Sequence, residues 1–158
     1  MHVTFRAMSQ VTSILGLELT ASLYPEGEPL QDRGHQALLK RVRDACSAAF
    51  RIAAEVPLPT PADPRAWDLV LRLGETVIGV EAETRLRDMQ AFVRRIHQRE
   101  LNGGVDEILI VLSASAFNRS IATELRHTLG ERHATPPRAL LRALRYGTQL
   151  PGSGVILI

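Results

Sequence analysis

Cysteine and lysine are almost absent from the sequence. Cys46 is the only cysteine, so no intrachain disulfide can form, and a reducing compartment is expected. No stretch approaches the roughly 18 consecutive apolar residues that a membrane span needs. The first twenty residues lack the cationic start and long apolar run of a signal peptide. These absences predict a cytoplasmic protein with no membrane association.

The sequence also lacks the motifs of several classes of enzyme and metal site. The sequence has no glycine-rich phosphate loop and no G-x-S-x-G, so nucleotide hydrolysis and serine hydrolase chemistry are not expected. His35, His97, His127 and His133 show no metal-ligand spacing with one another or with Cys46. No zinc site is therefore predicted.

The positive charge is nearly all arginine, with Lys40 the sole lysine. A formal net charge of +2 is too small to indicate nucleic-acid binding, because such binding comes from clustered phosphate contacts. Five arginines cluster within one predicted helix and just before it, and this cluster can face an anion. GC-rich codon usage is the competing explanation for the arginine bias. The cluster consists of Arg85, Arg87, Arg94, Arg95 and Arg99.

The length and patterning predict a single domain over residues 1–158, with residues 1–12 as a loose arm. Apolar residues alternate from Leu15 to Leu23, which indicates a half-buried strand. A helix follows, capped by Asp32 and extending to about Ala49. The apolar run 50–56 either extends this helix or forms the first core strand.

Prolines cluster over residues 57–64 and predict an extended crossover loop, because proline cannot donate to a sheet. A hairpin is expected next, with its turn at Gly74-Glu75 and its second strand ending at Glu83. Alternation in the first strand predicts two faces. One carries Trp67, Leu69, Leu71 and Leu73, and the other carries Asp68, Val70 and Arg72.

The rest of the chain alternates helices and strands, which predicts the α/β class. The core order is α-β-β-β-α-β, and the strand 108–112 is apolar on both faces, so the mixed sheet should have helices on both sides. The N-terminal strand and the C-terminal helices would add to this core. The expected later elements are a helix from Leu86 to Glu100, one from Asn118 or Ser120 to Leu129, one opened by Pro136-Pro137, and a final strand over 155–158.

Three carboxylates belong to the predicted hairpin. Glu81 and Glu83 are two positions apart and share one face of the second strand, and Asp68 lies in the first strand. Magnesium, and equally manganese, takes oxygen ligands of this kind and can activate water beside a phosphate. The alternatives are edge carboxylates paired with nearby arginines, or the relic of a former site.

Asp68 in one strand and Glu81-Ala82-Glu83 at the end of the next resemble the PD-(D/E)XK nuclease superfamily, whose restriction-endonuclease-like core has the same order of elements. The resemblance implies that Asp68 and Glu81 hold the metal. It also implies that Glu83 stands at the lysine position, where it would orient water, as in the minority of restriction endonucleases that use E-x-E. Gln90 and Arg94 would lie on the polar helix face near this edge.

A second resemblance covers nearly the whole chain from Leu15 onward. The chain is similar to a C-terminal domain of actinobacterial regulators that usually follows a helix-turn-helix of the Xre or Cro type. No helix-turn-helix precedes Leu15, so the resemblance does not extend to a recognition helix. The stretches that carry it are Leu23-Tyr24-Pro25, Pro57-Leu58-Pro59, Arg65-Ala66-Trp67-Asp68, Gly79 to Asp88, and Asn102-Gly103-Gly104-Val105-Asp106.

Two functions follow as expectations. One is a nuclease-like domain that contacts DNA, with metal-dependent phosphodiester hydrolysis at Asp68, Glu81 and Glu83. The other is a non-catalytic regulatory or dimerisation domain, and a homodimer is expected. The phosphate-binding candidates are Arg85, Arg94, Gln90 and Arg119; Arg85 can instead pair with Glu81 or Glu83, and a helix cap is the alternative role at Asn118-Arg119.

Overall fold

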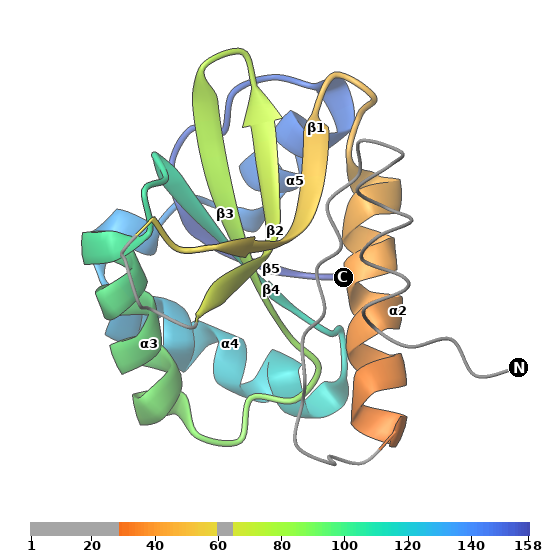
Figure 1. Ribbon diagram of the computed structural model, residues 1–158. Coiled ribbons are helices and arrows are strands. Elements are labelled where there is room, and N and C mark those ends of the chain that lie inside the picture. The colour runs from red at the N-terminus through yellow and green to blue at the C-terminus, as the bar shows by residue number, and fades with distance from the viewer. Residues whose placement is uncertain (1–28, 60–64) are drawn as a thin grey trace, which may run out of the picture.

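The computed structural model describes residues 29–59 and 65–158, with side chains from residue 33 onward (Figure 1). Its elements follow the predicted order α-β-β-β-α-β, to which two further helices and a strand are added. The elements are α2 (Pro29–Ala45), β1 (Arg51–Pro57), β2 (Ala66–Leu73), β3 (Thr76–Glu83), α3 (Met89–Asn102), β4 (Glu107–Leu112), α4 (Ala116–Leu129), η1 (Glu131–His133), α5 (Pro137–Tyr146) and β5 (Gly154–Leu157).

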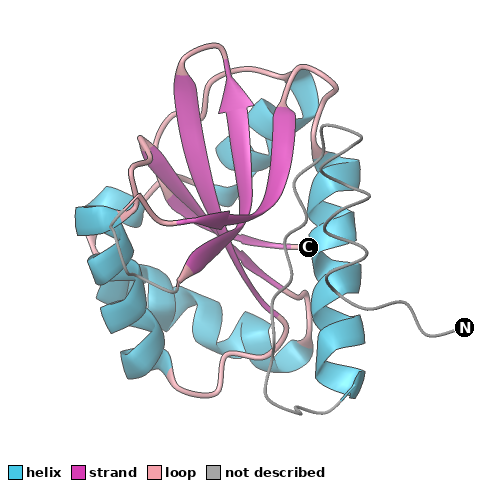
Figure 2. Ribbon diagram, in the orientation of Figure 1, coloured by secondary structure: helices cyan, strands magenta, loops and turns pink. Residues whose placement is uncertain are grey.

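The strands form one mixed sheet in the order β1-β2-β3-β4-β5 (Figure 2). β1 pairs antiparallel with β2, and β2 pairs antiparallel with β3. β3, β4 and β5 run parallel, and helices make the connections between them. The predicted α/β class with a mixed sheet is confirmed.

Helices cover both faces of this sheet, as the apolar strand 108–112 predicted. On one face, α2 and α5 pack through Leu38, Val42 and Leu140. On the other face, α3 and α4 pack through Phe92 and Leu125. Alternate residues of β4 therefore enter different cores, which explains why no polar residue interrupts its run from Ile108 to Leu112.

Several predicted boundaries need correction. The first described helix begins at Pro29, so Asp32 lies inside it and does not cap it, and the helix ends at Ala45. For the run 50–56, the strand alternative is confirmed for residues 51–56, which belong to β1, while Phe50 precedes the strand. Ser115, and neither Asn118 nor Ser120, caps α4, because its hydroxyl accepts a hydrogen bond from Asn118 N. The predicted arm, the strand from Leu15 to Leu23 and the loop residues 60–64 lie outside the described residues.

Trp67 does not share a face with Leu69 and Leu71, which corrects the predicted alternation. It lies in the core of α3 and α4, while Leu69 and Leu71 lie in the other core. Room for the indole comes from Gly79, where a Cβ atom would lie 2.7 Å from the ring. In the neighbouring strand β1, Glu55 interrupts the regular backbone with a φ of 50°. Glu55 lies between Ala54 and Val56, which pair with Leu69 and Trp67, and the distortion is therefore opposite Asp68.

Candidate functional site

Asp68 lies where β2 and β3 separate. Their pairing runs from Leu73–Thr76 to Leu69–Val80, and one step further Ala82 N donates to Asp68 Oδ2 at 2.7 Å. The other carboxylate oxygen lies 3.3 Å from Nε2 of His35 on α2. This contact raises the pKa of His35, although burial opposes the rise, and the charges of Glu83 and Glu81 add to it. Asp68 thus ties α2 to the end of β3.

Glu81 faces α3 and is only 5% exposed. Its Oε1 lies 3.0 Å from Arg95 Nε, and its Oε2 lies 3.0 Å from Arg99 Nη1. Arg95 Nε and Glu81 Oε2 have no hydrogen-bond partner among the described residues. The two contacts of Glu81 with the arginines are therefore mainly attractions between opposite charges. Arg99 is itself held by Ala66 O at 2.8 Å and by the Trp67 ring at 4.9 Å. A buried ion-pair cluster therefore joins β3 to α3.

Burial raises the pKa of Glu81 to about 7, and the nearby charge of Asp68 adds to the rise. Arg99 and Arg95 oppose the rise without cancelling it, because the desolvation of a carboxylate with so little exposure is the larger effect. Glu83 contributes a smaller increase. Glu81 and Glu83 both contact Arg95, and Asp68 accepts from Ala82 N between them, so the three predicted carboxylates gather at one edge.

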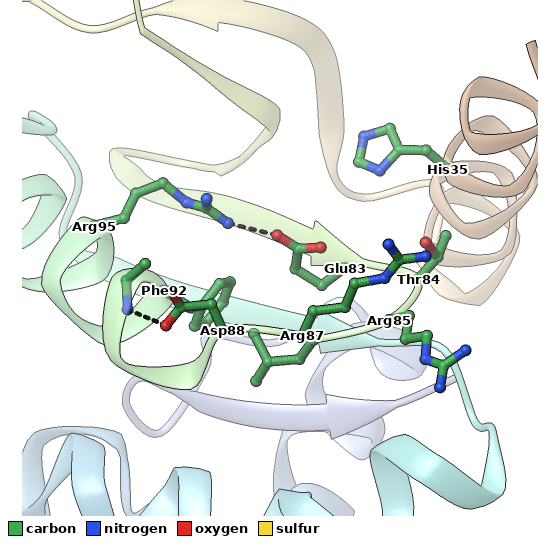
Figure 3. A pocket seen from close by; sticks show the side chains of 10 residues that line it. His35, Glu83, Thr84, Arg85, Arg87, Asp88, Phe92 and Arg95 are labelled. Atoms are coloured by element: carbon green, nitrogen blue, oxygen red, sulfur yellow. Dashed lines mark hydrogen bonds and ion pairs between the residues drawn. The ribbon is translucent and has the colours of Figure 1, made fainter. Parts of the chain in front are cut away.

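Arg95 connects two of these carboxylates. Its Nη2 lies 2.5 Å from Glu83 Oε1, while its Nε faces Glu81. Figure 3 shows Arg95 reaching Glu83 from α3, with His35 projecting from α2 on the opposite side of the same space. Carboxylates and cations therefore alternate across this edge, in the manner of the arginine pairing that was the alternative to a metal site.

The predicted magnesium or manganese ligands do not fit a metal ion in this arrangement. Both oxygens of Asp68 have protein partners, and both oxygens of Glu81 lie against guanidinium nitrogens. No group of three or more His, Cys, Asp or Glu side chains within residues 33–59 and 65–158 is placed to hold a metal. A hard cation needs open oxygen ligands, and here His35, Ala82 N and two arginines occupy those positions.

A pocket of about 570 Å³ opens beside Glu83, between α2 and the loop that joins β3 to α3 (Figure 3). Both acids in its wall are already engaged: Glu83 with Arg95, and Asp88 as the cap of α3, where it accepts from Ala91 N at 2.8 Å. The lining residues are His35, Glu83, Thr84, Arg85, Leu86, Arg87, Asp88, Ala91, Phe92 and Arg95.

Two arginines of this pocket have no acidic partner among the described residues. Arg85 lies over the Phe117 ring at 4.7 Å, and Arg87 makes no ion pair or side-chain hydrogen bond within the described part of the chain. The predicted pairing of Arg85 with Glu81 or Glu83 is wrong, because α3 supplies Arg95 and Arg99 instead. The pocket therefore carries an excess of positive charge suited to an anion.

The other predicted phosphate-binding residues do not line this pocket. Gln90 and Arg94 are exposed on α3. Arg119 donates to Ala114 O at 2.6 Å and so stabilises the start of its own helix. Only Arg85 of the four candidates reaches the pocket wall.

Asn118 is neither a cap nor an exposed ligand. It is fully buried, and its Nδ2 donates to Thr84 O at 2.9 Å and to Ser113 O at 2.8 Å. Its Oδ1 accepts from Leu86 N at 3.3 Å. Asn118 therefore clamps the β3–α3 loop to the end of β4, and it positions the wall of the pocket.

Three important residues were missing from the predicted site. Arg95 and Arg99 belonged to the predicted arginine cluster, and their spacing of four places both on the side of α3 that faces Glu81. The hydrophobic periodicity of this helix could have shown that Arg95 and Arg99 lie on its sheet-facing side, whereas Arg94 lies on its exposed side. His35 carried no signal, because its contact with Asp68 depends on how α2 packs across the sheet.

No protein-family model, curated protein or solved structure matches this chain. Among the described helices, none combines the length and the apolar character that crossing a membrane requires.

Proposed function

We propose that this chain is a nuclease-fold domain that contacts DNA through backbone phosphate and does not hydrolyse it. The observation that carries the proposal is the distribution of charge at the pocket. Glu81 and Glu83 are neutralised by Arg95 and Arg99, whereas Arg87 has no protein partner within the described residues. A domain whose site acids are engaged, and whose Arg87 has no ion-pair partner in the described part of the chain, can bind phosphate without the ligands for a catalytic metal.

The pocket wall offers the groups that a phosphate prefers. Arg85 and Arg87 are exposed, and a guanidinium can bind phosphate oxygens in a bidentate manner. The wall also includes the first turn of α3, whose positive end favours an anion. The hydrogen bonds of Asn118 to Leu86 N and Thr84 O fix the loop that joins β3 to α3 and carries these arginines. Such contacts are independent of base sequence, so we infer a positioning role on DNA.

The proposed setting is a cytoplasmic regulatory domain that acts as a homodimer, in keeping with the resemblance to actinobacterial regulators. In that setting, the domain would hold its protein on DNA by phosphate contacts. The ion pairs of Asp68, Glu81 and Glu83 then serve to fix α2 and α3 against the edge of the sheet.

DNA binding tests the proposal directly. We expect Arg87→Glu to weaken binding of a short labelled duplex about tenfold in fluorescence anisotropy, equivalent to roughly 1.4 kcal/mol. Arg72→Glu is the matched control, because Arg72 is exposed on β2 and lies outside the pocket. The proposal fails if the two variants bind the duplex with equal affinity.

Hydrolysis is the competing function, and a plasmid assay separates it from binding. Wild type and Glu81→Gln are incubated with supercoiled plasmid in magnesium and then in manganese. We expect neither protein to nick the plasmid under conditions where wild type binds the duplex. Nicking by wild type that Glu81→Gln lacks would replace the proposed role with an enzymatic one.

A further inference from the structure

A second pocket, of about 600 Å³, lies away from the first, at the C-terminal end of α2. α5 packs beside this end of α2 (Figure 1) and supplies most of the wall. None of its residues belongs to the pocket beside Glu83. The lining residues are Asp44, Ala45, Cys46, Ser47, Arg138, Leu141, Arg142, Arg145 and Tyr146.

The outer face of α5 carries a row of arginines. Arg138, Arg142 and Arg145 recur at helical spacing and are exposed, while the opposite stripe of the helix enters the core. None of the three makes an ion pair or side-chain hydrogen bond within the described part of the chain. Like charges three or four residues apart on a helix repel one another weakly, so an anion bound along the row would relieve this repulsion.

Little negative charge offsets the row from within the pocket. Asp44 is the only acidic residue in the wall, and its Oδ2 lies 2.6 Å from Nζ of Lys40. Cys46 adds no charge at neutral pH, since a thiol is already mainly protonated there and burial raises its pKa further, to about 11. The pocket is therefore strongly cationic at neutral pH.

An aromatic side chain stands at the end of the same row. Tyr146 is the last residue of α5 and is 68% exposed. It is one of the few large apolar side chains of the described residues that are exposed to solvent. The helix end that carries it is firmly placed. Ser47 N donates to Leu144 O at 2.8 Å, and Gly147, with a φ of 66°, fits closely against Ser47 and Ala49. The aromatic ring thus extends from a rigid base.

We propose that this face of α5 binds a single strand of nucleic acid, with phosphates along Arg138, Arg142 and Arg145 and a base stacked on Tyr146. The arginine row extends about 10 Å along the helix, enough to follow a strand past more than one phosphate. A cationic groove with an aromatic platform is the combination by which proteins hold single strands without sequence preference. An acidic protein segment fits less well, because Leu141 and Tyr146 alone offer little apolar surface for a protein interface.

The proposal goes beyond duplex contact at the first pocket, and the two sites can be tested separately. Fluorescence anisotropy with a labelled oligothymidine strand is measured for wild type, Arg142→Glu, and the double variant Arg138→Glu with Arg142→Glu. We expect affinity to fall at least tenfold in the double variant. The dependence of log affinity on log salt should flatten by about 0.7 for each phosphate that the variant no longer neutralises. Arg72→Glu is the control, because Arg72 is exposed on β2 and lines neither pocket, and it should bind this strand like wild type.

Tyr146 gives a second, independent readout. Tyr146→Ala should weaken binding of the strand about tenfold, whereas Tyr146→Phe should retain it, because stacking needs the ring and not the hydroxyl. Equal affinity of wild type and the double arginine variant would overturn the proposal. Competition by polyglutamate as strong as by unlabelled oligothymidine would also overturn it, in favour of an acidic protein partner.

Discussion

At the scale of single residues, Glu81 shows what holds the edge of the sheet. Its carboxylate lies between two arginines, yet burial keeps its pKa at about 7. The group therefore takes up a proton more readily in the folded protein than in the unfolded chain. Its ion pairs with Arg95 and Arg99 hold α3 against the sheet. Keeping the carboxylate charged in this buried position nevertheless raises the free energy of the folded protein.

This pKa predicts a pH dependence of stability. The folded-state pKa is raised above the ordinary value of 4.5, so the contribution of Glu81 is complete below pH 4.5 and is lost as the pH rises towards 7. We expect the free energy of unfolding of wild type, relative to Glu81→Gln, to fall by up to about 3 kcal/mol over this range. Urea unfolding of both proteins at several pH values measures the difference. A difference that grows with pH would contradict the assigned pKa shift.

Asn118 supports a second prediction at this scale. Asn118→Ala removes three hydrogen bonds from the backbone of two loops and leaves buried polar groups without partners. We expect a loss of about 3 kcal/mol in the free energy of unfolding, measured with urea. Ser120→Ala is the control, because Ser120 is exposed and its hydroxyl bonds, among the described residues, only to Phe117 O nearby. It should change stability by less than about 0.5 kcal/mol. Similar losses in both variants would refute the clamp.

The sequence located the acids of the site but not their partners. Strand alternation was sufficient to place Glu81 and Glu83 on one face, because that rule is local to β3. The pairing with Arg95, Arg99 and His35 depends on how α2 and α3 cross the sheet, which no local pattern encodes. The interactions that decide between metal and arginine therefore became visible only in three dimensions.

At the scale of elements, the hairpin and the helices follow from periodicity, and the exceptions have local causes. The β2–β3 hairpin turns at Gly74, where φ is 59°, as the sequence predicted. The helix α2 begins three residues before the predicted cap at Asp32, because proline is accepted in the first turn of a helix and Pro29 therefore does not delay its start. Trp67 changed face because Gly79 and Gly103 leave room for its ring, and the Gly103 carbonyl accepts its Nε1–H at 3.1 Å.

Gly79 supports a prediction about this packing. In Gly79→Ala, the new Cβ would lie 2.7 Å from the buried Trp67 ring, so we expect a loss of about 2 kcal/mol in the free energy of unfolding. Gly34→Ala, within α2, is the matched control. Its Cβ would lie 3.6 Å from Thr84 Cγ2, and the gain in helix propensity should stabilise the protein by roughly 0.5–1 kcal/mol. Thermal or urea unfolding that ranks the two variants in the opposite order would contradict the packing account.

At the scale of the whole molecule, two layers of helices enclose the sheet, and the two cationic pockets lie apart, at the edge near Glu83 and beside α5. The α-β-β-β-α-β order was predictable because each element has its own hydrophobic period and turn residues. The activity was not, because carboxylates at the edge of a sheet can hold either a metal or a set of ion pairs, and their spacing in the sequence is the same in both cases.

Calorimetric titration of wild type with manganese tests most directly whether protein groups, and not a metal, hold Asp68, Glu81 and Glu83. Arginine neutralisation of Glu81 and Glu83 predicts no stoichiometric binding of the cation, and the same heat signal for Glu81→Gln. Binding of one manganese ion per chain by wild type, abolished in Glu81→Gln, would contradict the account.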